Sequence, residues 1–166
     1  MEPRDIHISI PEQRLTLTLP GGAVRQWPVS TARRGPGQQR DSERTPLGRH
    51  VVRARIGEGL DPRAVLQGRR PTGEVYSEAL AAQFPARDWI LGRILWLSGT
   101  QPGFNRLGDV DTMRRLIYIH GTPDSEPLGV AASHGCIRMN CDDLVELFDA
   151  VPVGTPVTIS NGGVDQ

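Results

Sequence analysis

The chain has 166 residues, of which 37% are hydrophobic, and this length predicts one domain with a core of its own. Arginine supplies all 19 basic charges and 19 acidic residues balance them, so no general attraction to nucleic acid or an anionic membrane is indicated. Because there is no lysine, a Schiff-base lysine is excluded. No apolar run reaches the roughly 18 residues of a membrane-spanning helix, so no membrane segment is expected.

The N-terminus reads Met1-Glu2-Pro3-Arg4-Asp5-Ile6, and a strand pattern begins almost at once. A secretory signal would need a basic segment followed by an apolar run. We therefore expect a cytoplasmic protein. A periplasmic protein is the alternative if a signal has been removed from this chain.

Strand patterns dominate the chain. Apolar residues alternate with polar ones at 6–10 and again at 15–19, with a polar turn between them, which predicts a hairpin. Further strands are expected at 24–29, 49–56, 89–97, 115–120 and 157–159. Loops are expected at 32–44, 99–111 and 123–131, the second of them as a candidate flap.

Three short helices are expected among these strands. An Asp-Pro start predicts one at 61–66, and 74–84 is rich in helix-forming residues. Asn140 can cap a third helix, whose apolar residues share one face until Pro152 stops it. The elements predict a mostly β fold with small helices in one domain over residues 1–160, with a flexible tail at 161–166.

The chain holds only two cysteines, Cys136 and Cys141, so a disulfide framework is not expected. Cys141 lies at the expected start of the third helix and is interpreted as a small buried residue. Cys136 lies in Ser133-His134-Gly135-Cys136-Ile137-Arg138, a stretch with several reactive side chains. Of the two thiols, Cys136 is therefore the candidate nucleophile.

A thiol needs a base to become a useful nucleophile near neutral pH. His120 ends an apolar strand pattern and could be that base. Gly135 lets the backbone turn tightly, so the amides of His134, Gly135 and Cys136 are the natural donors for an oxyanion. One cysteine with a distant histidine is a weak signal, but an ordered His-Gly-Thr followed by Ser-His-Gly-Cys is much more specific.

This ordered pair resembles the active-site signature of the L,D-transpeptidase catalytic-domain family, also called the YkuD domain. Twelve residues separate His120 from Ser133, and Arg138 stands where crosslinking members of the family carry asparagine. The resemblance extends to 29–31, 45–48 and 153–159, and so covers nearly the whole chain. It implies that this single domain is a curved β-sandwich, that no cofactor is needed, and that carbapenems are an inhibitor class.

The resemblance also implies roles for individual residues. Cys136 would be the nucleophile, His120 its base, and the carbonyl of Gly121 the group that orients the histidine. The substrate would be a muropeptide or stem tetrapeptide, in which the L-centred carbonyl of diaminopimelate is bonded to a terminal D-Ala. Attack would release D-Ala and leave a thioester on the enzyme.

Two acceptors for that thioester stay open. Water would make an L,D-carboxypeptidase, which is favoured for a cytoplasmic enzyme of peptidoglycan recycling. The amine of a second stem would make a periplasmic L,D-transpeptidase that crosslinks the cell wall. A non-catalytic peptidoglycan-binding module is a further alternative, disfavoured because such a module would not need both Cys136 and His120.

The remaining motif residues have two interpretations each. Ser133 is expected to bind substrate or to fix its loop, and Arg138 to bind a substrate carboxylate or to form a structural ion pair. His134 is expected to shape the site. A metal bound by His120, His134 and Cys136 is disfavoured because the paired ligand spacing of zinc sites is missing, so no metal is expected.

Overall fold

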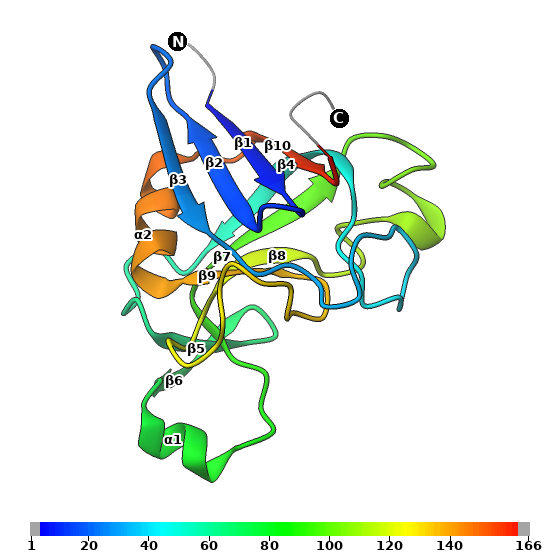
Figure 1. Ribbon diagram of the computed structural model, residues 1–166. Helices are drawn as coiled ribbons and strands as arrows, with labels where there is room; N and C mark the ends of the chain where they lie inside the picture. Colours follow the sequence, from blue (N-terminus) through cyan, green and yellow to red (C-terminus); the bar gives the residue numbers. More distant parts are fainter. Residues whose placement is uncertain (1–3, 163–166) are drawn as a thin grey trace.

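One ten-stranded sheet is the framework of the protein in this computed structural model, which describes residues 4–162 (Figure 1). Neighbouring strands follow the order β3-β2-β1-β10-β4-β7-β5-β6, while β8 pairs with β7 and β9 pairs with β8. The strands are β1 (Asp5–Ser9), β2 (Arg14–Thr18), β3 (Val24–Pro28), β4 (Gly48–Ile56), β5 (Ala64–Gln67), β6 (Arg70–Val75), β7 (Ile90–Gly99), β8 (Tyr118–Thr122), β9 (Ile137–Asn140) and β10 (Pro156–Ser160).

The N-terminal strands form the predicted hairpin. β1 and β2 are antiparallel, with Ile6 opposite Leu17 and Ile8 opposite Leu15, and all four side chains are fully buried. Because side chains alternate across a strand, this pairing buries one face of the hairpin. The last strand, β10, lies parallel to β1, so the two ends of the described chain meet in the same part of the sheet (Figure 1).

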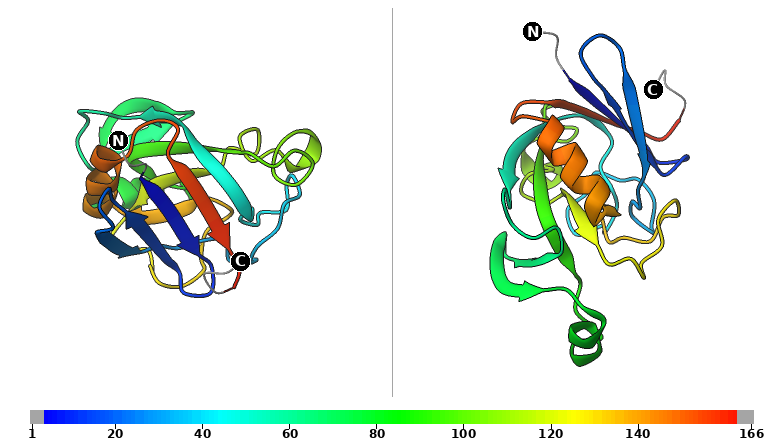
Figure 2. Two further views of the ribbon diagram at one scale, coloured as in Figure 1. Left: turned by 90° about the horizontal axis from the view of Figure 1, so that it is seen from above. Right: turned by 90° about the vertical axis from the view of Figure 1, so that its left-hand side faces the viewer.

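The sheet curls around its main core. Beyond β3, Ser30 forms a β-bridge with Arg138 of β9, so the chain leaving the edge strand β3 meets the outer strand of the β8–β9 branch. The helix α2 (Cys141–Ala150) packs one face against the core that the sheet encloses and leaves the opposite face exposed (Figure 2). Its apolar face is fully buried, and it consists of Leu144, Leu147 and Phe148. A mostly β fold with a curled sheet was predicted and is confirmed.

The start of α2 follows the prediction. The Asn140 side-chain oxygen accepts hydrogen bonds from the N–H groups of Asp142 (2.9 Å) and Asp143 (3.1 Å), two donors that a helix N-terminus would otherwise leave unpaired. Because β9 ends at Asn140 and the helix begins at the next residue, the cap makes the turn between them. The Asn140 cap thereby joins β9, which follows Cys136, directly to the helix whose apolar face lies in the main core.

Two helix predictions between 57 and 89 need correction. Residues 61–66 form a turn and then β5, because Asp61 caps only a turn (Arg63 N–H to Oδ1, 2.8 Å) and the apolar residues that follow are buried against β7. Of 74–84, the first residues belong to β6, and only α1 (Glu78–Gln83) is helical. The helix α1 projects at the far end from the termini (Figures 1 and 2).

Two smaller differences concern the region of the motif. The strand expected at 115–120 begins only at Tyr118, because Leu116 adopts φ 59°, which interrupts an extended chain. β9 was not predicted as a strand. Of the tail expected at 161–166, residues 163–166 lie outside the described part of the chain.

The loop at 99–111 is tied to the end of β4. Asn105 is fully buried and its side-chain amide donates to the carbonyls of Leu47 (3.1 Å) and Arg49 (2.9 Å). His50 binds the Thr112 hydroxyl through Nε2 (2.9 Å) and the Gly48 carbonyl through Nδ1 (3.0 Å). Burial lowers the pKa of His50 to about 4, so this residue is a neutral structural link at neutral pH.

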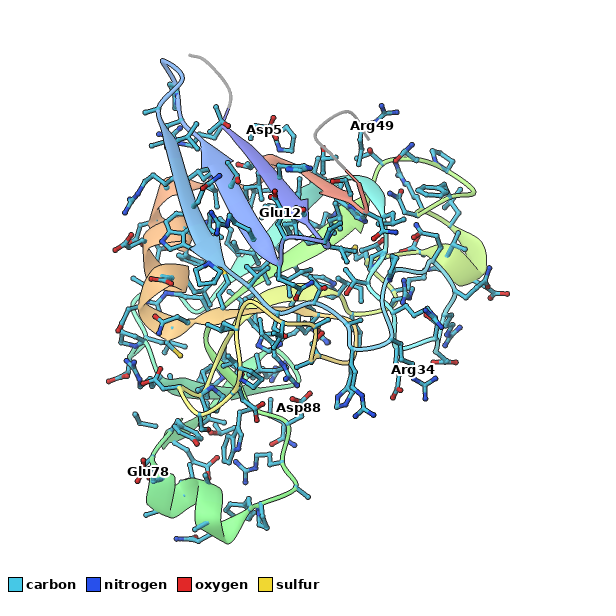
Figure 3. All side chains as sticks on the ribbon, in the orientation of Figure 1. Asp5, Glu12, Arg34, Arg49, Glu78 and Asp88 are labelled. Atoms are coloured by element: carbon cyan, nitrogen blue, oxygen red, sulfur yellow. The ribbon has the colours of Figure 1, made fainter. Side chains whose placement is uncertain are left out.

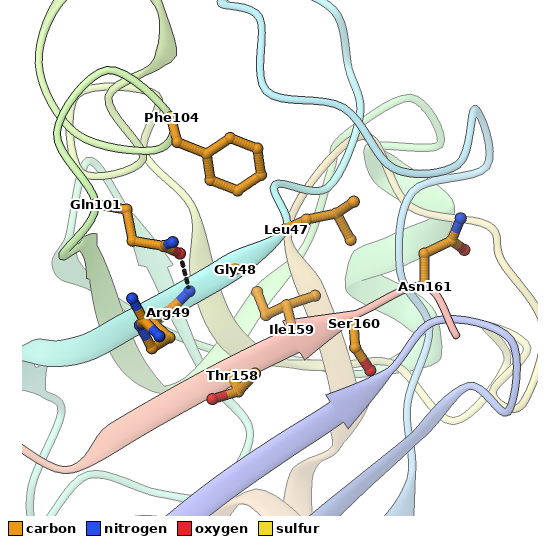
Figure 4. Close-up of a pocket in the computed structure, with 9 residues that line it drawn as sticks. All are labelled: Leu47, Gly48, Arg49, Gln101, Phe104, Thr158, Ile159, Ser160 and Asn161. Carbon is orange, nitrogen blue, oxygen red and sulfur yellow. Dashed lines mark hydrogen bonds between the residues drawn. The ribbon is translucent and has the colours of Figure 1, made fainter. Parts of the chain in front are cut away.

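A hollow of about 290 Å³ lies where this loop meets the ends of β4 and β10 (Figure 4). Phe104, Leu47 and Ile159 give it apolar walls, and Arg49 and Asn161 lie at its rim. None of the residues predicted to carry chemistry lines it. It is therefore separate from the site described next.

Candidate active site

The parallel pair of β8 and β9 carries the candidate site. Ile119 lies opposite Ile137, and His120 lies opposite Arg138. Ile119 and Ile137 point into the main core, so alternation along the strands puts His120 and Arg138 on the other face of the sheet. Cys136, one residue before β9, packs on this second face against a small apolar cluster that contains Tyr118 and Ile94.

The Cys136 thiol is half-buried and has two backbone partners. Its S–H donates to the carbonyl of Leu116 (3.3 Å), and its sulfur accepts the N–H of Tyr118 (3.3 Å). The left-handed conformation of Leu116 directs that carbonyl, because an extended residue there would continue β8. The thiol is thus held by the chain that enters β8, and within residues 4–162 no hydrogen bond joins it to His120.

His120 is buried, and its Nδ1 lies 2.8 Å from the carbonyl oxygen of Gly121. A carbonyl can only accept a hydrogen bond, so Nδ1 carries the proton and Nε2 keeps its lone pair. Sequence resemblance implied this orienting carbonyl, and the hydrogen bond is present. Gly121 is confined by its surroundings, since a Cβ there would lie 2.5 Å from the Leu91 carbonyl oxygen and 3.0 Å from Cys141 Sγ.

Both groups are neutral at rest near pH 7. Burial raises the pKa of the Cys136 thiol to about 11, and the Tyr118 N–H only partly offsets this. Burial also lowers the pKa of His120, against the opposing effect of its bond to Gly121. The charges of Asp88 and Arg138 act on both pKa values, so the thiol and the imidazole share one electrostatic environment.

Arg138 is held by two carboxylates. Its guanidinium lies 3.4 Å from Asp88 and 3.7 Å from Glu126, and it also donates to the Ala132 carbonyl (3.4 Å). Only 9% of the Arg138 side chain is exposed, whereas Asp88 and Glu126 are 59% and 43% exposed. Of its two sequence interpretations, the structural ion pair is the one seen in this structure, and it links the two loops that carry the acids.

The motif loop is held by internal hydrogen bonds. The Ser133 hydroxyl donates to the Cys136 carbonyl (2.6 Å) and accepts the Gly135 N–H (3.2 Å). The fully buried Thr45 hydroxyl donates to the Gly135 carbonyl (2.9 Å) and accepts the Ala32 N–H (2.9 Å). Gly135 itself has φ 131°, a conformation that favours glycine. These contacts give Ser133 a role in fixing the loop.

The three predicted oxyanion donors differ in their availability. The Gly135 N–H is already bound to Ser133 Oγ. The N–H groups of His134 and Cys136 have no hydrogen-bond partner among residues 4–162. The exposed side chain of His134 lines two polar hollows that adjoin the loop.

Sequence reasoning missed four groups that contact the site. The Leu116 carbonyl and the Tyr118 N–H are backbone groups, and no residue type announces them. Asp88 and Glu126 come from distant loops, and only the three-dimensional fold brings them to Arg138. A fifth group, the Thr45 hydroxyl, was also not singled out. Its only sequence signal was that Thr45 lies in the 45–48 stretch noted for its family resemblance.

Two further findings concern metal ions and membranes. No three His, Cys, Asp or Glu side chains within residues 4–162 are grouped in a way that could hold a metal ion. Neither α-helix in the same range is long and apolar enough to cross a membrane.

Comparison with known proteins identifies relatives of the chain. The family model of the L,D-transpeptidase catalytic domain matches residues 3–159. YqjB of Bacillus subtilis (strain 168), an L,D-transpeptidase by its provisional name, is 46% identical over 59 residues, or 36% of this chain and 32% of YqjB. The chain thus matches about a third of the length of this curated relative.

Solved structures share the fold. The L,D-transpeptidase LdtMt1 in complex with imipenem has a TM-score of 0.55 and 21% identity, covering 95% of this chain and 58% of that one. L,D-transpeptidase 3 of Mycobacterium tuberculosis with a faropenem-derived adduct has a TM-score of 0.58 and 17% identity, covering 95% and 60%. Because the family model spans nearly the whole chain, this protein belongs to the L,D-transpeptidase catalytic domain family.

Proposed function

We propose that this chain is a cysteine acyl-transfer enzyme that acts on peptidoglycan stem peptides, with Cys136 as the nucleophile and His120 as its base. The observation that carries the proposal is His120, buried on the same face of the sheet as the thiol with its Nδ1 engaged by the Gly121 carbonyl. This leaves Nε2 free to accept a proton. Family membership supports the reaction class.

In the first step, Cys136 Sγ attacks the acyl carbonyl of the donor peptide while His120 Nε2 takes the thiol proton. Collapse of the tetrahedral intermediate breaks the bond to the leaving amine, and His120 returns the proton to that amine. A thioester to Cys136 and a free amino acid result. By family resemblance the attacked carbonyl is the L-centre of diaminopimelate and the product is D-Ala.

The resting protonation states favour proton transfer during attack over a preformed ion pair. A thiol pKa near 11 leaves little thiolate at pH 7, and the lowered pKa of His120 keeps its imidazole neutral. The proton that leaves Sγ must first give up its bond to the Leu116 carbonyl. A bound substrate that excludes water would strengthen the electrostatic interactions of the charges that develop on Sγ and on His120 during attack.

The oxyanion of the intermediate needs donors that are already in position. The N–H groups of Cys136 and His134 are the candidates, because no protein acceptor among residues 4–162 occupies them. The Gly135 N–H would have to leave Ser133 Oγ before it could contribute. Ser133 and Thr45 then act as positioning residues for the turn that presents these donors.

Two acceptors can resolve the thioester. Water gives an L,D-carboxypeptidase, the outcome favoured from the sequence together with a cytoplasmic role in peptidoglycan recycling. The amine of a second stem gives an L,D-transpeptidase, and the names of the relatives support this second candidate. β-Lactams of the carbapenem and penem classes are proposed inhibitors, since the related folds were solved with imipenem and a faropenem-derived adduct.

Product analysis tests the proposal. The purified protein is incubated with a disaccharide tetrapeptide at high concentration, and D-Ala, tripeptide and crosslinked dimer are quantified. Release of D-Ala that Cys136→Ala abolishes supports the acyl-enzyme. Tripeptide without dimer favours hydrolysis, dimer favours transpeptidation, and an absence of all three products contradicts the proposed function.

A further inference from the structure

Two polar hollows adjoin the loop that carries Cys136. The first has a volume of about 340 Å³ and the second about 220 Å³, and His134 and Glu43 line both of them. Leu116, whose carbonyl accepts a hydrogen bond from the Cys136 thiol, lines the first hollow, and Ser133 lines the second. Both hollows therefore begin at residues that hold or flank the thiol.

Arginines dominate the walls of these hollows. The second hollow is lined by Arg33 and Arg34, and the first by Arg40, Arg114 and Arg115. The lining carboxylates are Asp41 and Glu43. Because the whole chain carries 19 basic and 19 acidic residues, this excess of positive charge is a local feature beside the motif.

Three of the five guanidinium groups are available to a ligand. Arg34 forms an ion pair with Glu43 (3.5 Å), and Arg115 donates to backbone carbonyls. The side chains of Arg33, Arg40 and Arg114 are exposed and form no hydrogen bond or ion pair within residues 4–162. Figure 3 shows Arg34 on the same lower side of the molecule as Asp88, the acid that binds Arg138.

Arg115, which lines the first hollow, holds the adjoining loop in place. Its guanidinium donates to the carbonyls of Gly37 (3.2 Å) and Arg44 (2.6 Å) and to the Ser42 hydroxyl (3.3 Å), so it fixes the 37–44 loop to the turn before β8. Its charge also favours the thiolate of Cys136, which lowers that pKa against the effect of burial. The hollow is thus formed before any ligand arrives.

We propose that the two hollows form an anion subsite that binds a carboxylate of the peptide whose acyl group is transferred to Cys136. This inference rests on the proposed function and names the part of the substrate that the site recognises. A guanidinium fork suits a carboxylate because it can donate two parallel hydrogen bonds. An extended peptide advances about 3.5 Å per residue, so a carboxylate one or two residues from the attacked carbonyl would reach past Leu116.

A binding cycle tests the subsite without requiring turnover. All proteins carry Cys136→Ala, so that the tetrapeptide binds but does not react. Calorimetry compares the free tetrapeptide with one whose carboxylates are amidated, in the parent and in a variant with Arg33→Gln, Arg40→Gln and Arg114→Gln. Arg53→Gln is the matched control, since Arg53 is an exposed arginine of β4 that lines neither hollow.

We expect the triple substitution to weaken binding of the free tetrapeptide by about tenfold and amidation to weaken it to a similar extent. The two losses should not add, and the amidated peptide should bind the parent and the triple variant equally. Raising the salt concentration should weaken only the free tetrapeptide in the parent. Arg53→Gln should leave binding unchanged.

Equal losses for the free and amidated peptides, no loss in the triple variant, or no detectable binding to the parent would overturn the subsite. These outcomes are independent of the proposed chemistry, which the thiol-dependent release of D-Ala tests separately. An active enzyme with charge-insensitive binding would refute only the subsite. Carboxylate-dependent binding in a protein that releases no D-Ala would refute only the reaction.

Discussion

The two cysteines lie five positions apart, one before β9 and one at the start of α2, and comparing them shows how the candidate nucleophile differs from the other thiol. Burial raises the pKa of both to about 11. Cys136 is half-buried, with its sulfur between the Tyr118 N–H and the Leu116 carbonyl. Cys141 is 1% exposed, and its S–H lies 3.5 Å from the Thr122 carbonyl.

The surroundings of the two thiols differ more than their pKa values. Cys141 begins a helix, a position that usually lowers a thiol pKa, but burial raises the pKa more than the charge of Arg63 lowers it, and Asp124 and Asp142 raise it further. Its sulfur fills the space behind Gly121, which has no room for a Cβ. Cys136 instead shares its charged neighbours with a histidine whose tautomer is fixed. Access and a neighbouring base, rather than the resting pKa, distinguish the candidate nucleophile.

Replacement of each thiol should produce the largest contrast. Cys136→Ser should lower D-Ala release by about 10⁴-fold or more, because a hydroxyl is a far weaker nucleophile in the same place. Cys141→Ser should retain most of the activity and cost about 1 kcal/mol of unfolding free energy. Tetrapeptide turnover and urea unfolding measure both effects. If Cys141→Ser were as inactive as Cys136→Ser while still folded, the contrast would be wrong.

Gly121→Ala should disrupt the packing around Gly121, which lies between the His120 side of the candidate site and Cys141. The new Cβ would lie 2.5 Å from the Leu91 carbonyl oxygen, so we expect a loss of about 3 kcal/mol in unfolding free energy. The shift should also disturb the carbonyl that orients His120. Adding Cys141→Ala should not restore stability, because the Leu91 backbone clash remains. A double variant as stable as the parent would show that sulfur, not backbone, confines this glycine.

The pH dependence of alkylation sharpens the comparison further. With a pKa near 11, either native thiol should react with iodoacetamide at pH 8 roughly 200-fold more slowly than an unfolded thiol of pKa about 8.5. Below pH 11, the rate should rise about tenfold per pH unit, and Cys136 should be modified before the more deeply buried Cys141. Rapid alkylation of Cys136 at pH 8 would instead indicate a preformed thiolate–imidazolium pair.

The same thiols make a prediction for stability at high pH. Because folding raises their pKa values from about 8.5 to about 11, the contribution to stability is present below pH 8.5 and is lost as the pH rises toward 11. Urea midpoints should therefore fall across this window. The fall should be smaller in Cys141→Ser, which no longer has that thiol. A midpoint that is flat from pH 8 to 11 in the parent protein contradicts the raised pKa values.

The smallest expected effects come from the two arginines that face these thiols. Arg138→Gln removes a cation that favours the Cys136 thiolate, so alkylation of Cys136 should slow a few-fold while Cys141 is unaffected. Arg63→Gln should slow Cys141 in the same way and spare Cys136. Arg138→Lys, which keeps the charge, serves as the control. Equal effects on both cysteines would point to a general loss of structure.

The motif and much of the sheet could be predicted from local patterns. Alternating apolar residues were sufficient for β1 and β2, and the Asn140 cap with its apolar face was sufficient for α2. His120 and the loop of Cys136 could be recognised as a candidate site because the ordered motifs His-Gly-Thr and Ser-His-Gly-Cys are an unusual combination. The Gly121 hydrogen bond followed only from family resemblance.

Other features depend on distant parts of the chain. Residues 61–66 begin with a helix-like Asp-Pro signal, but 61–63 form only a turn and pairing with β7 and β6 makes the residues from Ala64 onward a strand. The left-handed Leu116 and the acids around Arg138 result from tertiary contacts that no local pattern carries. Arginines 33, 40 and 114 are ordinary surface residues in sequence, and only the fold gathers them next to His134.

The central claim is a thioester on Cys136, and peptide mapping of the trapped intermediate tests it most directly. Trypsin cleaves after Arg115 and Arg138, so Cys136 falls in peptide 116–138 and Cys141 in peptide 139–166. After brief incubation with disaccharide tetrapeptide and an acid quench, we predict that peptide 116–138 alone gains the mass of the disaccharide-tripeptide acyl group, and that Cys136→Ala abolishes the gain. An adduct on peptide 139–166, or product formation by Cys136→Ala, would contradict the account.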